Sequence, residues 1–120
     1  MLPNQLRRVA KRAAIGIGRT GTAGGNSSGD IFLAFSVAND LDWPSRHGEQ
    51  PTAYALDFIN DHYFDDIYRA VVQSIEESIV NAMIAAESMT TVKPEGYRLE
   101  AIDHNRLKQI MSQYNRLRDS

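Results

Sequence analysis

Residues 18–39, GRTGTAGGNSSGDIFLAFSVAN, decide how the rest of the chain can fold. Six of the eight glycines lie between Gly16 and Gly29, so the backbone there must turn tightly or approach another group closely. The glycines lead directly into Ile31–Asn39, a run that is rich in β-branched and aromatic residues and nearly continuous in its apolarity. Such a run predicts a strand that is buried on both faces.

Helical periodicity lies on both sides of this stretch. A helix that is basic on its outer face is expected from Leu2 to about Ile17, with Pro3 in its first turn. Tyr63–Ser88 is the clearest helix, with an apolar stripe and a second stripe of small residues that predict burial on more than one side. Thr52–Ile59 is a candidate second strand, and Asp103 is the expected N-cap of a final helix. Asp40–Gln50 is expected to be a surface excursion and Thr90–Glu100 a linker, because both contain proline and glycine.

Length and composition indicate one ordinary soluble domain. With 120 residues, 42% of them hydrophobic, the chain can bury a core without help from a metal or a disulfide. The absence of cysteine excludes disulfides, thiolate zinc sites and cysteine nucleophiles, and fits a cytoplasmic location. No apolar run approaches the ~20 residues of a membrane span, and no export signal is visible, so no membrane partner is expected.

The charges are unevenly distributed along the chain. The stretch between Thr20 and Val92 contains 11 acidic residues but only two basic ones. Two interpretations stay open for the basic start: an arm that binds nucleic acid, or a helix face that neutralises a neighbouring acidic surface. No aromatic residue is interleaved for base stacking, which favours the second, and no nucleic-acid partner is expected. The basic residues that precede any acid are Arg7, Arg8, Lys11, Arg12 and Arg19.

Cofactor and metal motifs are weak. Gly16–Gly21 satisfies G-x-G-x-x-G, but the expected helix precedes it and the expected strand follows it, the reverse of a dinucleotide-binding unit. The histidines His47, His62 and His104 stand far apart, in no spacing typical of metal ligands. We therefore expect neither a cofactor nor a metal.

Ser28-Gly29-Asp30 is a candidate for chemistry, since residues two apart in an extended chain project to the same side. The carboxylate of Asp30 can orient the hydroxyl of Ser28 or accept its proton, so Ser28 can relay a proton to or from a nucleophile opposite. The alternative is that both side chains only satisfy amides of the loop, as Ser and Asp often do at turns. Spacing alone favours this alternative.

Gly18–Asn39 resembles the signature of the L-aminopeptidase/D-amidase/D-esterase family, the DmpA-like peptidases. The resemblance extends back through LPNQLRRVAKRAAIGIG and forward through ESIVNAMIAAESMT, and the closing helix agrees at Asn105, Arg106 and Leu107. Almost the whole chain is covered, apart from Asp40–Gln50. A match this long is specific.

The resemblance implies an α+β fold that is part of an αββα sandwich of the N-terminal-nucleophile-hydrolase type, helix-rich with one or two buried strands. It implies a precursor that cleaves itself, so that a serine becomes the nucleophile at the start of the smaller subunit. Ser28 matches the family's second active-site serine and Asp30 its neighbouring acid. The loop Thr20–Asn26 then lines the substrate site through its backbone, with Gly24, Gly25 and Asn26 as the expected substrate-binding residues.

The departure from the family pattern is as informative as the match. The strand that begins with the nucleophile would precede Met1, and the larger subunit with its oxyanion-stabilising groups is also missing. Residues 1–120 are therefore expected to be a single partial domain, the carboxy-terminal portion of the peptidase, and inactive alone. The expected partners are the large subunit of the same precursor, a peptide or aminoacyl amide or ester substrate, and further copies in a homo-oligomer.

Two other functions stay open. One is a truncated, catalytically inactive product that acts as an interaction module or has no function. The other is acyl transfer of the ornithine acetyltransferase type, which is similar in fold and self-cleavage. There the nucleophile is threonine, and the motif SGDIFLAFS argues against it.

Overall fold

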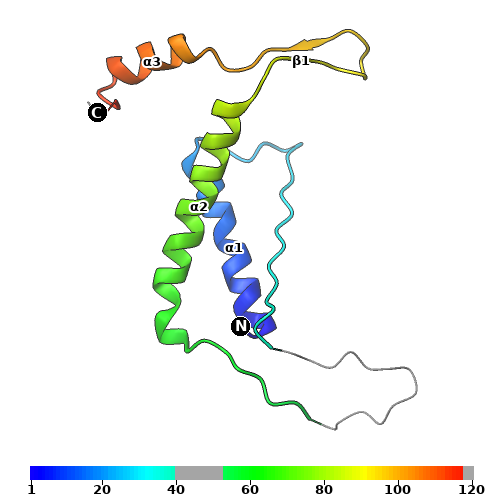
Figure 1. Cartoon of the computed structure of the whole chain (residues 1–120), viewed down its shortest axis with the longest axis vertical. Helices are drawn as coiled ribbons and strands as arrows, with labels where there is room; N and C mark the ends of the chain where they lie inside the picture. Colours follow the sequence, from blue (N-terminus) through cyan, green and yellow to red (C-terminus); the bar gives the residue numbers. More distant parts are fainter. Residues whose placement is uncertain (40–52, 118–120) are drawn as a thin grey trace. The chain divides into compact units, whose positions relative to one another are not determined.

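The computed structural model describes residues 1–39 and 53–117 and contains three α-helices. The helices are α1 (Pro3–Arg19), α2 (Phe64–Ala85) and α3 (His104–Gln113) (Figure 1). A short 3₁₀ turn, η1 (Asp61–Tyr63), comes directly before α2. Two strands, β1 (Met89–Thr90) and β2 (Arg98–Leu99), lie between α2 and α3 in the sequence. The chain divides into two compact units, Met1–Glu76 and Glu77–Ser120, each described by itself below. No helix among the described residues is long and apolar enough to cross a membrane.

The helix α1 confirms the helix expected at the start of the chain. Pro3 occupies its first turn, where a missing N–H costs nothing, and the side chain of Gln5 accepts a hydrogen bond from the Leu2 N–H at 3.0 Å. At the other end the hydroxyl of Thr20 donates to the Ile17 carbonyl at 2.7 Å, and Gly21 turns the chain away with a φ of +96°.

In the first unit, α1 packs along the first turns of α2 in a parallel direction. The Arg8 guanidinium lies 4.8 Å from the centre of the Phe64 ring, and Arg12 lies 4.1 Å from the centre of the Tyr68 ring. Residue numbers rise together on the two helices, which fixes their common direction. Further along, Arg19 pairs with Glu76 at 2.6 Å. The basic face of α1 therefore neutralises acidic neighbours at Arg19 and, as the next contacts show, at Arg8.

A buried glutamine anchors the start of α1 to the turn before α2. Only 2% of Gln5 is exposed, and its amide donates to the Ile59 carbonyl at 2.7 Å and to the Asp61 carboxylate at 2.8 Å. Asp61 also accepts from the Arg8 guanidinium at 2.6 Å. Phe64 is as fully buried as Gln5, so an apolar ring and a satisfied polar group together form the centre of this small core.

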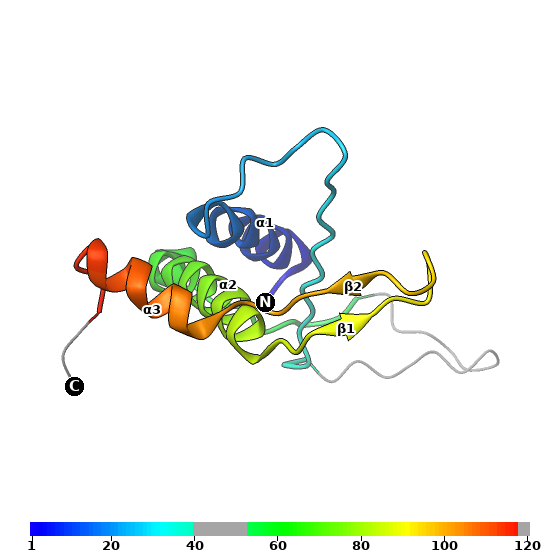
Figure 2. The same cartoon turned by 90° about the horizontal axis from the view of Figure 1, so that it is seen from above.

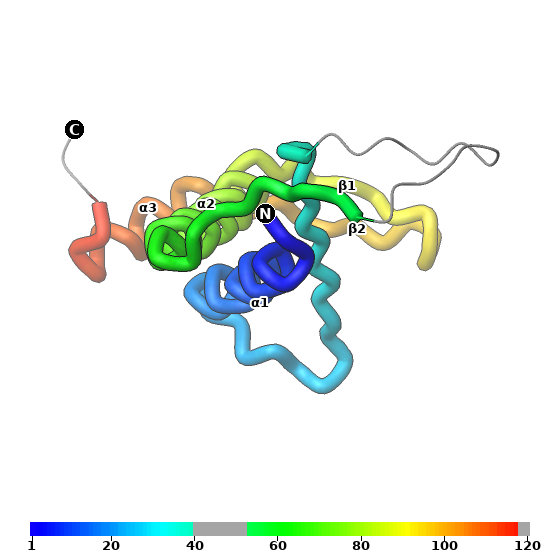
Figure 3. The backbone as a smooth tube through the Cα atoms, turned by 90° about the horizontal axis from the view of Figure 1, so that it is seen from below, coloured from blue at the N-terminus to red at the C-terminus, as the bar shows by residue number. Residues whose placement is uncertain are grey.

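Ile31–Asn39 was expected to be a buried strand and Thr52–Ile59 a second strand, but neither segment forms a strand among the described residues. No residue from 31 to 39 or from 53 to 59 belongs to a strand, and the side chains of the first segment are open to solvent: Ile31 is 99% exposed, Leu33 86% and Val37 88%. A buried strand needs neighbours on both edges and both faces, and no described residue supplies them. Figure 3 shows the loop after α1 leading into this segment, which follows an extended course beside the helix. The predicted surface excursion, Asp40–Gln50, lies outside the described residues.

The second unit contains a hairpin where a linker was expected (Figure 2). The strands β1 and β2 pair antiparallel, with Met89 opposite Leu99, and the turn includes Gly96 at a φ of +77°. Proline and glycine are typical of a linker, whereas here they shape the turn. Asp103 caps α3 as predicted, since its carboxylate accepts from the N–H groups of Asn105 and Arg106.

Replacing Gly16 by alanine is expected to destabilise the first unit. A Cβ at Gly16 would lie 2.7 Å from the Cβ of Ile75 and 2.8 Å from the Val72 carbonyl oxygen, so α1 and α2 would have to separate. We expect a loss of about 1–3 kcal/mol in the free energy of unfolding, measured by urea denaturation. Gly18→Ala is the matched control, because a methyl group at that position would meet no atom within 4 Å. Equal stabilities for the two variants would contradict the close helix contact.

Stability should also depend on pH through Asp61. The hydrogen bond from Arg8, and then that from Gln5, hold the pKa of Asp61 below its ordinary value of 3.8. The folded-state pKa is lowered, so this stabilisation is complete above pH 3.8 and is lost as the pH falls further through the folded value. In acid titrations of thermal stability, Asp61→Asn should therefore be less stable than the wild type at neutral pH and approach it in strong acid. Glu77→Gln, on an exposed part of α2, is the control. A difference between Asp61→Asn and the wild type that is independent of pH would refute this role for the charge.

The exposed apolar segment predicts that the isolated 120-residue chain binds hydrophobic dyes. Changing Leu33 and Val37 together to serine should lower dye fluorescence without altering the urea midpoint of the helical core, because neither side chain is buried. A matched double change at two exposed polar positions, Gln73→Ser with Glu77→Ser, should leave dye binding unchanged. Dye binding that survives the Leu33 and Val37 changes would locate the apolar surface elsewhere.

Candidate functional site

The glycine-rich loop between α1 and the extended segment has a defined shape. Gly24 has a φ of +64°, a conformation in which a side chain is strained, and its N–H donates to the Thr22 hydroxyl at 3.2 Å. The Gly25 carbonyl then accepts both the N–H and the hydroxyl of Ser28, each at 2.9 Å. A methyl group placed at Gly25 or Gly29 would meet no atom within 4 Å beyond the immediate neighbours. The loop is therefore a tight turn with open space on its outer side.

Ser28 and Asp30 are both exposed at the end of this turn, and no hydrogen bond joins them within residues 1–39 and 53–117. The Ser28 hydroxyl donates instead to Gly25, as the structural alternative for this serine predicts. To relay a proton, the hydroxyl has to leave the carbonyl of Gly25 and turn toward a reacting group. The geometry permits this, because the side chain is exposed and held by a single bond.

Gly24, Gly25 and Asn26, predicted to bind substrate, lie in the same turn and are exposed. Two of their backbone groups are engaged within the loop: the Gly24 N–H donates to the Thr22 hydroxyl, and the Gly25 carbonyl accepts from Ser28. In the part of the chain that the structure describes, no three His, Asp or Glu side chains gather in a way that could hold a metal ion. His62 and His104 lie in that part, and His47 lies outside it.

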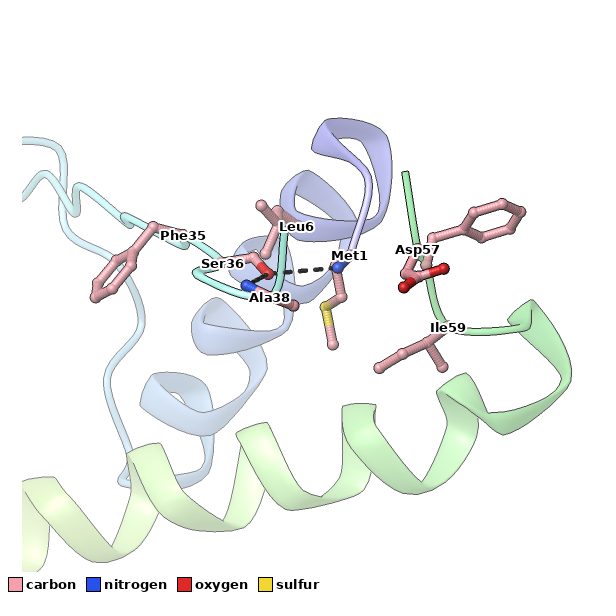
Figure 4. A pocket seen from close by; sticks show the side chains of 8 residues that line it. Met1, Leu6, Phe35, Ser36, Ala38, Asp57 and Ile59 are labelled. Atoms are coloured by element: carbon pink, nitrogen blue, oxygen red, sulfur yellow. Dashed lines mark hydrogen bonds between the residues drawn. The ribbon is translucent and has the colours of Figure 1, made fainter. Parts of the chain in front are cut away.

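Two hollows in the described part of the first unit lie along the extended segment rather than beside the loop. One has a volume of about 360 Å³ and lies where the segment ends, with the hydroxyl of Ser36 and the carboxylate of Asp57 as polar groups in an apolar lining (Figure 4). The other, of about 320 Å³, is lined by residues of α1 and by Phe32, Leu33 and Ala34. None of the residues from Thr20 to Asp30 lines either hollow.

A polar contact that the sequence did not reveal lies at the edge of the larger hollow. The carboxamide of Asn39 accepts from the Asp57 N–H at 2.8 Å and donates to the Asp57 carbonyl at 3.0 Å. The only hint in the sequence is that Asn39 is the first strongly polar residue after the apolar run. Its partner lies 18 residues further on, a separation that no local pattern encodes.

Comparisons with known proteins agree with the signature in the loop. The family model of peptidase family S58 matches residues 1–96, which include the whole candidate site. The β-peptidyl aminopeptidase BapA of Sphingosinicella microcystinivorans is 40% identical over 117 residues, covering 98% of this chain and 28% of that protein. BapA of Sphingosinicella xenopeptidilytica is 37% identical, covering 92% of this chain and 26% of that protein.

Solved structures extend the agreement to the fold. The L-aminopeptidase D-Ala-esterase/amidase of Ochrobactrum anthropi, described as a prototype of the serine aminopeptidases and a variant of the Ntn hydrolase fold, is 49% identical with a TM-score of 0.83. It is matched over 98% of this chain and 32% of that one. A β-aminopeptidase of Burkholderia sp. is 31% identical with a TM-score of 0.87, over 99% of this chain and 33% of that one.

The chain thus spans between a quarter and a third of the length of these relatives. The similarity to these two structures confirms the predicted fold class, even though residues 31–39 and 53–59 are not strands here. Because the family model matches residues 1–96 of the 120, the chain belongs to peptidase family S58.

Proposed function

We propose that this chain is the carboxy-terminal portion of a self-cleaving serine aminopeptidase, which releases the N-terminal residue of peptides, amides or esters. The observation that carries the proposal is the family S58 match over residues 1–96, with Ser28 and Asp30 exposed together at the end of the glycine turn. The aminopeptidase activities named for the relatives support the same class of reaction. The substrate class is an N-terminal aminoacyl group joined to an amine or an alcohol.

In the proposed reaction a serine hydroxyl from the part of the protein outside this chain attacks the acyl carbon of the substrate. The C–N or C–O bond breaks, the acyl group stays on that serine, and the leaving amine or alcohol takes up a proton. Ser28 relays this proton, and Asp30 orients the Ser28 hydroxyl as a carboxylate acceptor. Water then attacks the acyl carbon, the bond between that carbon and the serine oxygen breaks, and the free acid is released. The proton that water loses passes through the same pair to the oxygen of the nucleophilic serine.

The loop from Thr20 to Asn26 supplies the floor of the proposed site. Gly24 and Gly25 let the backbone approach a substrate closely because neither carries a side chain, and the positive φ of Gly24 excludes most replacements. Asn26 follows them and adds a carboxamide that can accept or donate a hydrogen bond. We propose that these three residues contact the substrate.

The proposed partners are the larger subunit of the same precursor and further copies of the two-chain unit. The apolar side chains of the extended segment, which lie open to solvent, favour a covering partner. They also favour the view that the 120 residues alone do not hydrolyse substrates. An inactive product that persists as an interaction module is the alternative that the same exposure supports.

Ser28→Ala and Asp30→Asn should lower kcat of the full-length enzyme by about 10²- to 10⁴-fold, the usual contribution of positioned proton transfer. Activity is measured as release of p-nitroaniline from L-alanyl, D-alanyl and β-alanyl anilides. Asp30→Glu should retain much more activity, because it keeps the carboxylate. The matched control is Ser27→Ala, which removes the adjacent exposed hydroxyl and should leave turnover unchanged.

Circular dichroism should be the same for all these variants, since none of the side chains is buried. Wild-type turnover in both Ser28→Ala and Asp30→Asn would refute the assignment of the pair. Equal losses in Ser27→Ala and Ser28→Ala would point to the shape of the loop rather than to a proton relay.

A further inference from the structure

The side chain of Asn39 forms a contact of a kind that strands normally make with their backbones. Its carbonyl oxygen accepts from the Asp57 N–H at 2.8 Å while its amide donates to the Asp57 carbonyl at 3.0 Å. A residue in an antiparallel ladder exchanges the same two bonds with its opposite neighbour. Asn39 thus imitates one rung of a ladder between residues 31–39 and 53–60, although no described residue of these segments belongs to a strand.

The apolar pattern of residues 31–37 does not by itself specify the register of the segment, that is, its position along its own axis relative to its neighbour. In a strand with one buried face, a slip of one residue would move its apolar side chains into solvent, so the pattern specifies the register. Ile31–Val37 has apolar side chains on both faces, and a slip exchanges one apolar residue for another. A polar side chain that exchanges two hydrogen bonds with one backbone position distinguishes the registers, and Asn39 is such a side chain.

Asp57 is itself held in place by its connection to α1. Two residues further on, the Ile59 carbonyl accepts from the buried Gln5 amide at 2.7 Å, and Asp61 accepts from the same amide at 2.8 Å. The partner of Asn39 is therefore fixed relative to the helix. The glycine loop connects one end of the extended segment to α1 (Figure 1). At the other end, Asn39 bonds to Asp57, and the Met1 ammonium donates to the Ser36 hydroxyl at 3.4 Å.

We infer that Asn39 sets the axial register of the extended segment, and thereby positions Ser28 and Asp30 at its opposite end. An extended chain is stiff along its axis, so a slip of one residue at Asn39 moves the whole segment by about 3.3 Å. Displacements of that size are ample to disable a proton relay. Asn39 is a positioning residue, and this part of the inference rests on the proposed function.

The register can be measured without any activity. The chain has no cysteine, so Lys11→Cys and Ile31→Cys place two spin labels at exposed sites, one on α1 and one near the start of the segment. Pulsed electron paramagnetic resonance should give one narrow distance distribution in this labelled protein. Asn39→Ala should broaden it or add a population shifted by about 3–7 Å, corresponding to slips of one or two residues.

Two further variants keep the distance measurement decisive. Asn39→Asp keeps the size of the side chain and the acceptor for the Asp57 N–H, but it replaces the donor by an anion that repels the Asp57 carbonyl, so it should shift the distances even if Asn39→Ala does not fold. Gln73→Ala removes an exposed carboxamide from α2 and should leave them unchanged. Unchanged distances in a folded Asn39→Ala or Asn39→Asp protein would overturn the inference.

Kinetics of the full-length enzyme test whether the register acts through Ser28. Asn39→Ala should lower kcat by about 10- to 100-fold with little change in KM, because reacting groups are misplaced while substrate contacts remain. In a Ser28→Ala background the same change should cost less than about twofold, since the relay is already absent. Equal losses in both backgrounds would overturn the positioning role. Wild-type turnover in Ser28→Ala would overturn both the proposed function and the positioning role of Asn39. In that case the distance measurement would still show whether Asn39 sets the register of the segment.

Discussion

The contact between α1 and α2 at Gly16 is the constraint on which the first unit depends. Val72 and Ile75 approach the helix so closely at this point that no side chain larger than hydrogen fits without movement. The contacts on either side follow from this approach, because it brings the arginines of α1 over the aromatic rings of α2 and places Gln5 against the turn before α2. A close helix pair thus provides the fixed frame, and the glycine loop and the extended segment are attached to it.

This frame explains why the candidate site can be shaped within so small a chain. The loop begins where α1 ends, and its glycines allow the backbone to reverse direction before Ser28. The segment that follows carries Asp30 and then a series of apolar side chains with no cover among the described residues. Two polar contacts connect its far end to the frame: the Asn39 carboxamide with the Asp57 backbone, and the Met1 ammonium with the Ser36 hydroxyl. This exposed apolar surface is the observation behind the proposal of a covering partner.

Local patterns in the sequence predicted the helices and the cap of α3 at Asp103, because periodicity and capping depend on neighbours a few residues away. Local patterns could not predict correctly which segments form strands. Ile31–Asn39 has the composition of a buried strand, but pairing depends on residues far away in sequence, and the described chain does not provide them. The β1–β2 hairpin was missed for the opposite reason, since its proline and glycine are equally typical of a linker.

In the candidate site, too, some features could be predicted from the sequence and others could not. Spacing alone left Ser28 and Asp30 as ordinary turn residues, and the hydrogen bond from Ser28 to Gly25 agrees with that local role. The similarity of the whole segment to a peptidase signature suggested a catalytic role, and the family S58 match places that segment within its family. The Asn39 contact could not be predicted from the sequence, because it joins residues that lie 18 positions apart along the chain.

We propose above all that this chain works as the carboxy-terminal portion of a larger serine aminopeptidase. The most direct test is to read the coding DNA immediately upstream of Met1. The account predicts an open frame that continues upstream and encodes a strand beginning with serine, preceded by a larger subunit. An in-frame stop codon directly before Met1 would contradict it, since Ser28 and Asp30 would then have no nucleophile to serve.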